Sequence, residues 1–270
     1  MNLLRVEMRR ALHRRLVWVL IAVALVGCVI LGIVAFVDSA GKTVAELRAS
    51  GEHPAMMAAW WVAGGGDGTL LIAAFPLFLG GLIGGASVAG AEWKMSTVAT
   101  VLTWEPRRVR LQLARVASAF LLAAAIGFIL QGMFLLSAVP AVATHGSTAG
   151  VDAGWWWSLV AAMARISLIT AGSAALGASL ATIGRNTSFA LVAGFGWMAI
   201  GENLVRAYKP GLSQLLLGEN IAIALTWAPL GGVEFTRSEV EAAGTLVVYA
   251  ALIVGAATWS FKRRDIAGTS

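Results

Sequence analysis

Apolar runs of about 20 residues alternate with short polar and basic segments along nearly the whole chain. A helix needs about 20 predominantly apolar residues to cross the hydrocarbon core of a membrane, which is roughly 30 Å thick. Each run therefore predicts a transmembrane helix, and Glu202 interrupts one of them near its end. The six predicted spans cover residues 16–37, 69–91, 116–139, 155–183, 188–204 and 242–261.

The composition agrees with this pattern and excludes a soluble protein. Of the 270 residues, 59% are hydrophobic and 13% are charged, whereas roughly a quarter of the residues in soluble domains are charged. A soluble fold could not bury this much apolar surface. We therefore expect an all-α membrane protein in which residues 1–270 form a single transmembrane domain.

Lysine and arginine gather at alternate ends of the predicted spans. Cytoplasmic flanks and short loops carry the excess of positive charge, so both termini are predicted to lie in the cytoplasm and the chain to be a multi-pass protein of the cell membrane. The net charge of +6 is then a topology signal, and we expect no nucleic-acid partner because the basic residues are dispersed among membrane flanks. The basic residues predicted inside are Arg5, Arg9, Arg10, Arg14, Arg15, Lys94, Arg107, Arg108, Arg110, Arg115, Arg185, Lys262, Arg263 and Arg264.

The segment before the first span, residues 1–15, carries five arginines among apolar residues. A helix could sort these residues into two faces, and a basic amphipathic helix of this kind lies in the membrane interface and binds membrane lipid. An ordinary basic flank is the alternative. The length of the segment favours the interfacial helix.

The stretch over residues 211–232 is apolar enough to suggest a seventh span, but Gly218, Glu219 and Asn220 form a polar break in its middle. Such a break is costly in lipid. A seventh crossing would also place Lys262 and Arg263 outside, against the charge rule. We therefore expect a re-entrant segment that dips into the outer leaflet and returns before the sixth span.

Small residues recur along the second span at Gly80, Gly81, Gly84 and Gly85. This spacing lets the backbones of neighbouring helices approach closely. The pattern fits tight packing inside one subunit and also an interface between two copies. The sequence leaves both interpretations open.

The longest predicted cytoplasmic connection covers residues 92–115 and has internal organisation. Ser96 and Thr97 are good amino-terminal caps for a helix over residues 98–104, and Pro106 disfavours helical geometry at Glu105. The segment therefore predicts a short helix across the cytoplasmic mouth of the protein, followed by a basic cluster. Such a helix is suited to docking a soluble partner.

At this segment the chain resembles a known family, the type-2 permeases of the ATP-binding-cassette exporters. The resemblance rests on Glu92, Thr97, Leu102, Pro106, Arg108 and Arg115, together with the interfacial helix, the six spans and the re-entrant segment. Two positions depart from the family pattern, with Ser96 in place of Gly and Arg115 in place of Lys. Ser96 keeps the capping chemistry, and Arg115 keeps the positive charge.

The resemblance implies a permease subunit that exports a hydrophobic or amphipathic compound. Its partners would be a nucleotide-binding ATPase subunit, which binds ATP and Mg²⁺, and a second permease chain, identical or related. The short helix between spans two and three would be a coupling helix. The residues that would contact the ATPase subunit are Glu92, Thr97, Val98, Val101, Leu102, Trp104, Glu105, Pro106, Arg107 and Arg108.

We expect no enzyme and no cofactor in this chain itself. The sequence matches the last three positions of a phosphate-binding loop at Gly41, Lys42 and Thr43. The first glycine that such a loop requires is replaced by Phe36. The three histidines, His13, His53 and His145, have no spacing that would assemble a metal site.

Arg165 and Glu202 are ionisable residues within predicted spans, and such residues mark substrate pathways. Arg165 could bind an anionic group of a substrate, pair with Glu202, or extend toward the membrane surface. Two other functions also fit the architecture, a secondary carrier or channel and a non-transporting membrane scaffold. Co-purification with an ATPase and a transport assay would separate the three.

Overall fold

The structure is a computed structural model that describes residues 3–51, 53–62, 68–95, 97–228 and 237–263, with Lys94, Val98 and Ala99 described by their backbone alone. Within these ranges the chain forms helices and no β-strands. Six helices or helical segments are long and apolar enough to cross a membrane, as the sequence predicts.

The six long segments extend beyond the apolar runs that predict them. The third, for example, begins eight residues before its run, because helical hydrogen bonding continues through Arg108 and Arg110 after the apolar pattern has ended. The fifth is built from three consecutive pieces, one of which is a π turn. The segments are α2 (Arg15–Ser39), α4 (Thr69–Lys94), α6 (Arg108–His145), α7 (Ala153–Gly184), α8 (Thr187–Gly196) with the π turn Trp197–Gly201 and α9 (Glu202–Tyr208), and α11 (Glu239–Arg263).

The centre of the molecule is the contact between α4 and α7. A Cβ atom built on Gly85 would lie 1.9 Å from the carbonyl oxygen of Ala174, and one on Gly81 would lie 2.5 Å from that of Thr170. These two glycines therefore let the helix backbones touch. Gly80 has nothing within 4 Å of such a Cβ atom. The small residues that face α7 thus serve packing inside one subunit.

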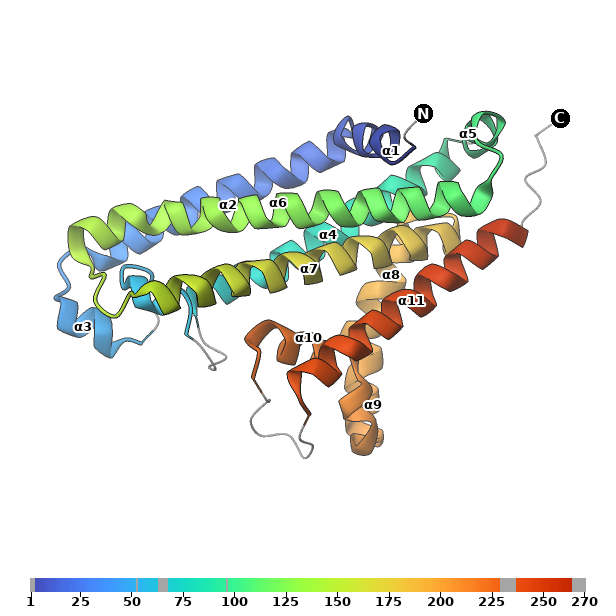
Figure 1. Ribbon diagram of the computed structural model, residues 1–270. Helices are drawn as coiled ribbons and strands as arrows, with labels where there is room; N and C mark the ends of the chain where they lie inside the picture. The colour runs from blue at the N-terminus through green and yellow to red at the C-terminus, as the bar shows by residue number, and fades with distance from the viewer. Residues whose placement is uncertain (1–2, 52, 63–67, 96, 229–236, 264–270) are drawn as a thin grey trace.

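Short helices occupy both ends of the molecule. At one end lie α1 (Leu3–Leu12), α5 (Val98–Trp104) and the last turn of α11, and at the opposite end lies α3 (Val44–Ala49) (Figure 1). α1 is a separate helix that packs on α6, with Glu7 and Ala11 buried. Its position in a membrane interface stays a prediction.

The apolar stretch after α9 forms two short helices, Pro210–Leu215 and α10 (Leu217–Thr226). Ten helical residues extend about 15 Å, half of what a membrane crossing requires. α10 packs against α11 and α7. The segment is therefore no seventh span, as the sequence predicts, while its re-entry into the membrane stays a prediction and residues 229–232 lie outside the described ranges.

Candidate functional site

The helix α5 occupies residues 98–104, as predicted, and ends because Glu105, which precedes Pro106, has an extended backbone. Thr97 stands at the amino-terminal cap position, but its side chain makes no capping hydrogen bond. Its hydroxyl instead donates to the carbonyl oxygen of Glu92, at 3.4 Å. The capping role expected of Thr97 is therefore not formed, and Ser96 lies outside the described residues.

The side chains of α5 divide into an inner and an outer group. Val101 and Leu102 are partly buried against Leu111 of α6 and Phe261 of α11. Trp104 is 86% exposed. Of the apolar residues proposed to contact a partner, Trp104 is thus presented outward, and Val101 and Leu102 attach α5 to the long helices.

The residues that follow α5 are held by local polar contacts. Glu105 accepts hydrogen bonds from the backbone N–H of Arg107, at 3.3 Å, and from the guanidinium of Arg110, at 3.5 Å. Arg108 donates to the carbonyl oxygen of Lys262 near the end of α11, at 3.5 Å. Pro106 and Arg107 are exposed. The turn between α5 and α6 is therefore linked to α11.

Four ionisable side chains from α1, α4 and α6 form a cluster that is called the charge cluster here: Glu7, Arg10, Glu92 and Arg115. Arg10 pairs with Glu7 at 2.8 Å and with Glu92 at 2.9 Å, and Arg115 pairs with the other oxygen of Glu92. The side chains of Glu92 and Arg115 are almost completely buried. The charge cluster joins α1, α4 and α6.

The pKa values of two arginines outside the spans reflect this arrangement. Burial disfavours the charge on Arg10, but the carboxylates of Glu92 and Glu7 outweigh it and raise the pKa of Arg10 above its ordinary value. Burial lowers the pKa of Arg14, with Glu92 opposing the shift. Arg14 donates hydrogen bonds to the carbonyl oxygens of Ser87 and Val88 in α4, at 2.5 and 2.8 Å. The amino-terminal segment is thereby fixed to α4.

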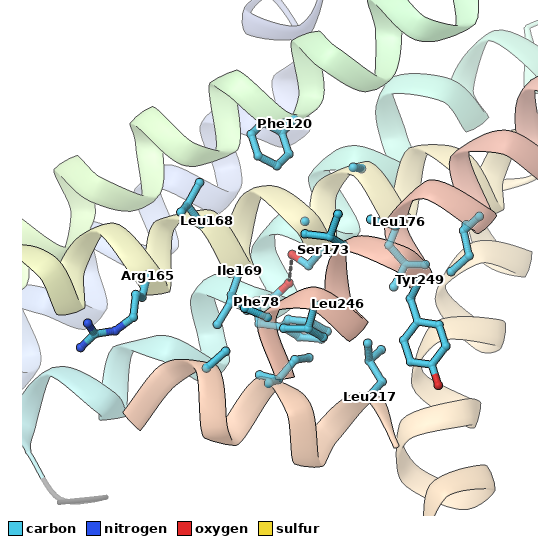
Figure 2. Close-up of a pocket in the computed structure, with 18 of the residues that line it drawn as sticks. Phe78, Phe120, Arg165, Leu168, Ile169, Ser173, Leu176, Leu217, Leu246 and Tyr249 are labelled. Carbon is cyan, nitrogen blue, oxygen red and sulfur yellow. Dashed lines mark hydrogen bonds between the residues drawn. The ribbon is translucent and has the colours of Figure 1, made fainter. Parts of the chain in front are cut away.

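A pocket of about 340 Å³ opens between α4, α6, α7, α10 and α11. Its wall is almost entirely apolar and includes Phe78, Phe120 and Leu246 (Figure 2). Ser173 is one of its few polar residues, and its hydroxyl is hydrogen-bonded to the carbonyl oxygens of Phe78 and Thr170, at 2.8 Å each. The volume lies in the range of small-molecule sites, about 300–1,000 Å³.

Arg165 lines this pocket at one end, with Tyr249 at the other (Figure 2). Its guanidinium carbon lies 5.4 Å from the ring centroid of Trp61 and 5.4 Å from that of Trp227. Each cation–π contact of this kind contributes about 0.5–2 kcal/mol. The two rings therefore stabilise the charge of Arg165.

Glu202 lies outside the pocket and has a different role. Its carboxylate accepts a hydrogen bond from the backbone N–H of Gly218, at 3.0 Å, and so caps the start of α10. The pair between Arg165 and Glu202, which the sequence left open, is not formed among the described residues. Glu202 links α9 to α10. Of the two residues, only Arg165 lines the pocket.

No sequence pattern predicts the two tryptophans that flank Arg165. Trp61 precedes α4, and Trp227 follows α10 with a left-handed backbone, φ 53°. Both resemble ordinary interfacial tryptophans in the sequence, and only the fold brings them to one guanidinium. Within the described part of the chain, no group of three or more His, Cys, Asp or Glu side chains could hold a metal ion.

The sequence was also compared with known proteins. No family model matches the chain, and no curated protein is significantly similar to it.

Proposed function

We propose that this chain is the permease subunit of an ATP-binding-cassette exporter that moves a hydrophobic or amphipathic compound across the membrane. ATP and Mg²⁺ are bound by a separate nucleotide-binding subunit, and a second permease chain, identical or related, completes the transporter. One observation carries the proposal: a short helix, α5, is suspended between two long apolar helices and presents Trp104 with 86% of its surface exposed.

The way α5 is attached suits a coupling element. Val101 and Leu102 pack against α6 and α11, while the charge cluster joins the neighbouring ends of α1, α4 and α6. A displacement of α5 by a partner would therefore be passed to several spans at once. Tryptophan and arginine are also enriched among the residues that dominate protein interfaces. Trp104 and Arg107 are exposed, and Arg108 beside them is half-buried.

The test is the loss of ATPase association in a Trp104→Ala/Arg108→Ala double variant. The tagged chain is purified from its native membranes, and the nucleotide-binding subunit that co-purifies is quantified with ATP hydrolysis and transport. Losing about 2 kcal/mol at an interface hot spot weakens binding about thirtyfold. We expect at least that loss, with the spans still inserted because neither residue contributes to an apolar run.

A matched control is Trp157→Ala, which removes a 77% exposed tryptophan from α7, at the opposite end of the molecule. This variant should keep ATPase association and transport. A double variant that is inserted, keeps its ATPase and still transports would refute the coupling role of α5. Purification with no ATPase at all would favour a carrier, a channel or a scaffold.

A further inference from the structure

The pocket between α4, α6, α7, α10 and α11 has two chemically different parts. Its middle is apolar, with Phe78, Leu176 and Leu246 turned into it (Figure 2). At one end Arg165, which also lines the pocket, extends its side chain away from Ser173 (Figure 2). A ligand that matches both parts must have an apolar body and a polar group at one end.

The charge of Arg165 lacks an anionic partner among the described residues. None of the ion pairs in the described part of the chain involves Arg165, and its Nε atom is buried with no hydrogen-bond partner there. Its close neighbours are the rings of Trp61 and Trp227. Rings favour a cation but accept no strong hydrogen bond, so the guanidinium donors stay available.

We infer that this pocket binds an acidic amphiphile, with the carboxylate or phosphate of the ligand on Arg165 and its aliphatic chain along the apolar wall. An arginine fork donates two parallel hydrogen bonds to either type of acid. The acid would supply the counter-charge that the described residues do not. This inference rests on the proposed function only where it names the class of compound that is transported, because binding of the ligand requires no ATPase.

The binding test uses the purified chain in nanodiscs of zwitterionic phosphatidylcholine, with radiolabelled dodecanoate as the probe. Dodecyl phosphate should displace the probe, whereas dodecanol and dodecyltrimethylammonium, which share the chain but lack an acid, should be at least tenfold weaker. Arg165→Gln should weaken dodecanoate binding at least tenfold and leave dodecanol unchanged. Arg165→Lys, which keeps the charge, should bind better than Arg165→Gln.

Two further variants separate the pocket from general effects on the protein. Arg185→Gln removes a cation from the far end of α7, where it lies over Trp93 and outside the pocket, and should alter binding less than twofold. Gly172→Leu adds a side chain at a pocket-lining position where a Cβ atom would meet nothing within 4 Å, so it should fill the pocket and block dodecanoate.

A second arm distinguishes the two sources of an acidic amphiphile. Phosphatidylglycerol added to the nanodiscs displaces dodecanoate if the natural ligand is a bilayer lipid, and fails to displace it if the ligand is a free single-chain acid. Either result supports the acid-binding pocket. Equal competition by dodecanol, or an Arg165→Gln variant that binds dodecanoate normally, would overturn it while leaving the coupling role of α5 untouched.

Discussion

Glu92 and Arg115 show what a single residue pair does in this fold. Both side chains are buried, and Glu92 also pairs with Arg10 from α1. Removing one member of a buried ion pair leaves the other charge without compensation, which costs far more than the net contribution of the intact pair. The charge cluster is therefore sensitive to single substitutions and much less so to paired ones.

Arg115→Ala should lower the thermal unfolding midpoint of the purified protein strongly. Loss of a buried partner costs about 3–5 kcal/mol, and the lower end applies here because Arg10 remains beside Glu92. Arg110→Ala is the control, since its pair with Glu105 is longer, at 3.5 Å, and half-exposed, and such pairs contribute about 0–1 kcal/mol. Equal shifts in the two variants would contradict the structural importance of the charge cluster.

The same residues show where sequence reasoning stops. The resemblance predicts that Glu92 and Arg115 belong to the partner-facing segment, whereas their burial and the pairing of Glu92 with Arg10 depend on how α1 packs on α6. No local pattern encodes a contact between residues so distant in the chain. Likewise, helical spacing cannot tell that Val101 and Leu102 face inward while Trp104 faces outward.

At the scale of elements, the close contact between α4 and α7 depends on glycines, which have no Cβ atom. Gly81 and Gly85 face the backbone of α7, whereas Gly80, on the same helix, faces open space. The sequence predicted close packing along this helix but could not say which glycines face it. Only the three-dimensional structure distinguishes the glycines that pack against α7 from those that do not.

Gly85→Ala should destabilise the protein, because the new methyl group would overlap the carbonyl oxygen of Ala174. Overpacking of this kind costs about 1–3 kcal/mol. Gly80→Ala is the matched control and should be neutral or slightly stabilising, since alanine is the better helix former and space is open at this position. Thermal unfolding of both variants in the same detergent measures the difference. A Gly85→Ala variant as stable as Gly80→Ala would rule out the backbone contact.

The long helices were the most predictable elements, because an apolar run of about 20 residues has few other structures available to it. The end of α5 was equally predictable, since Pro106 restricts the residue before it. The boundaries of α6 were not, because hydropathy marks where lipid contact ends and not where helical hydrogen bonding ends.

At the scale of the whole molecule, the charge distribution predicts that the end with α1, α5 and the last turn of α11 faces the cytoplasm. The grouping of these three elements at one end agrees with an even number of crossings (Figure 1). Cysteine labelling determines which end faces the cytoplasm.

Cysteine labelling in intact cells tests this orientation, in a Cys28→Ala background. The exposed positions Thr148 and Lys209 lie on the side predicted to be outside, and Thr103 on α5 lies on the side predicted to be inside. Thr148→Cys and Lys209→Cys should therefore react with an impermeant maleimide, and Thr103→Cys should react only after the cells are opened. Labelling of Thr103→Cys in sealed cells would reverse the topology.

The π turn in the fifth span resets the angular position of every residue after it. An α-helix advances about 100° per residue, so an uninterrupted helix would place Glu202 about 80° around its axis from Gly194. A turn closed between residues i and i+5 holds one residue more, which returns Glu202 to within about 20° of Gly194. Both residues are buried. One additional residue thus keeps the carboxylate of Glu202 on the buried face of the helix, from which the regular α-helical period would rotate it by about 80°.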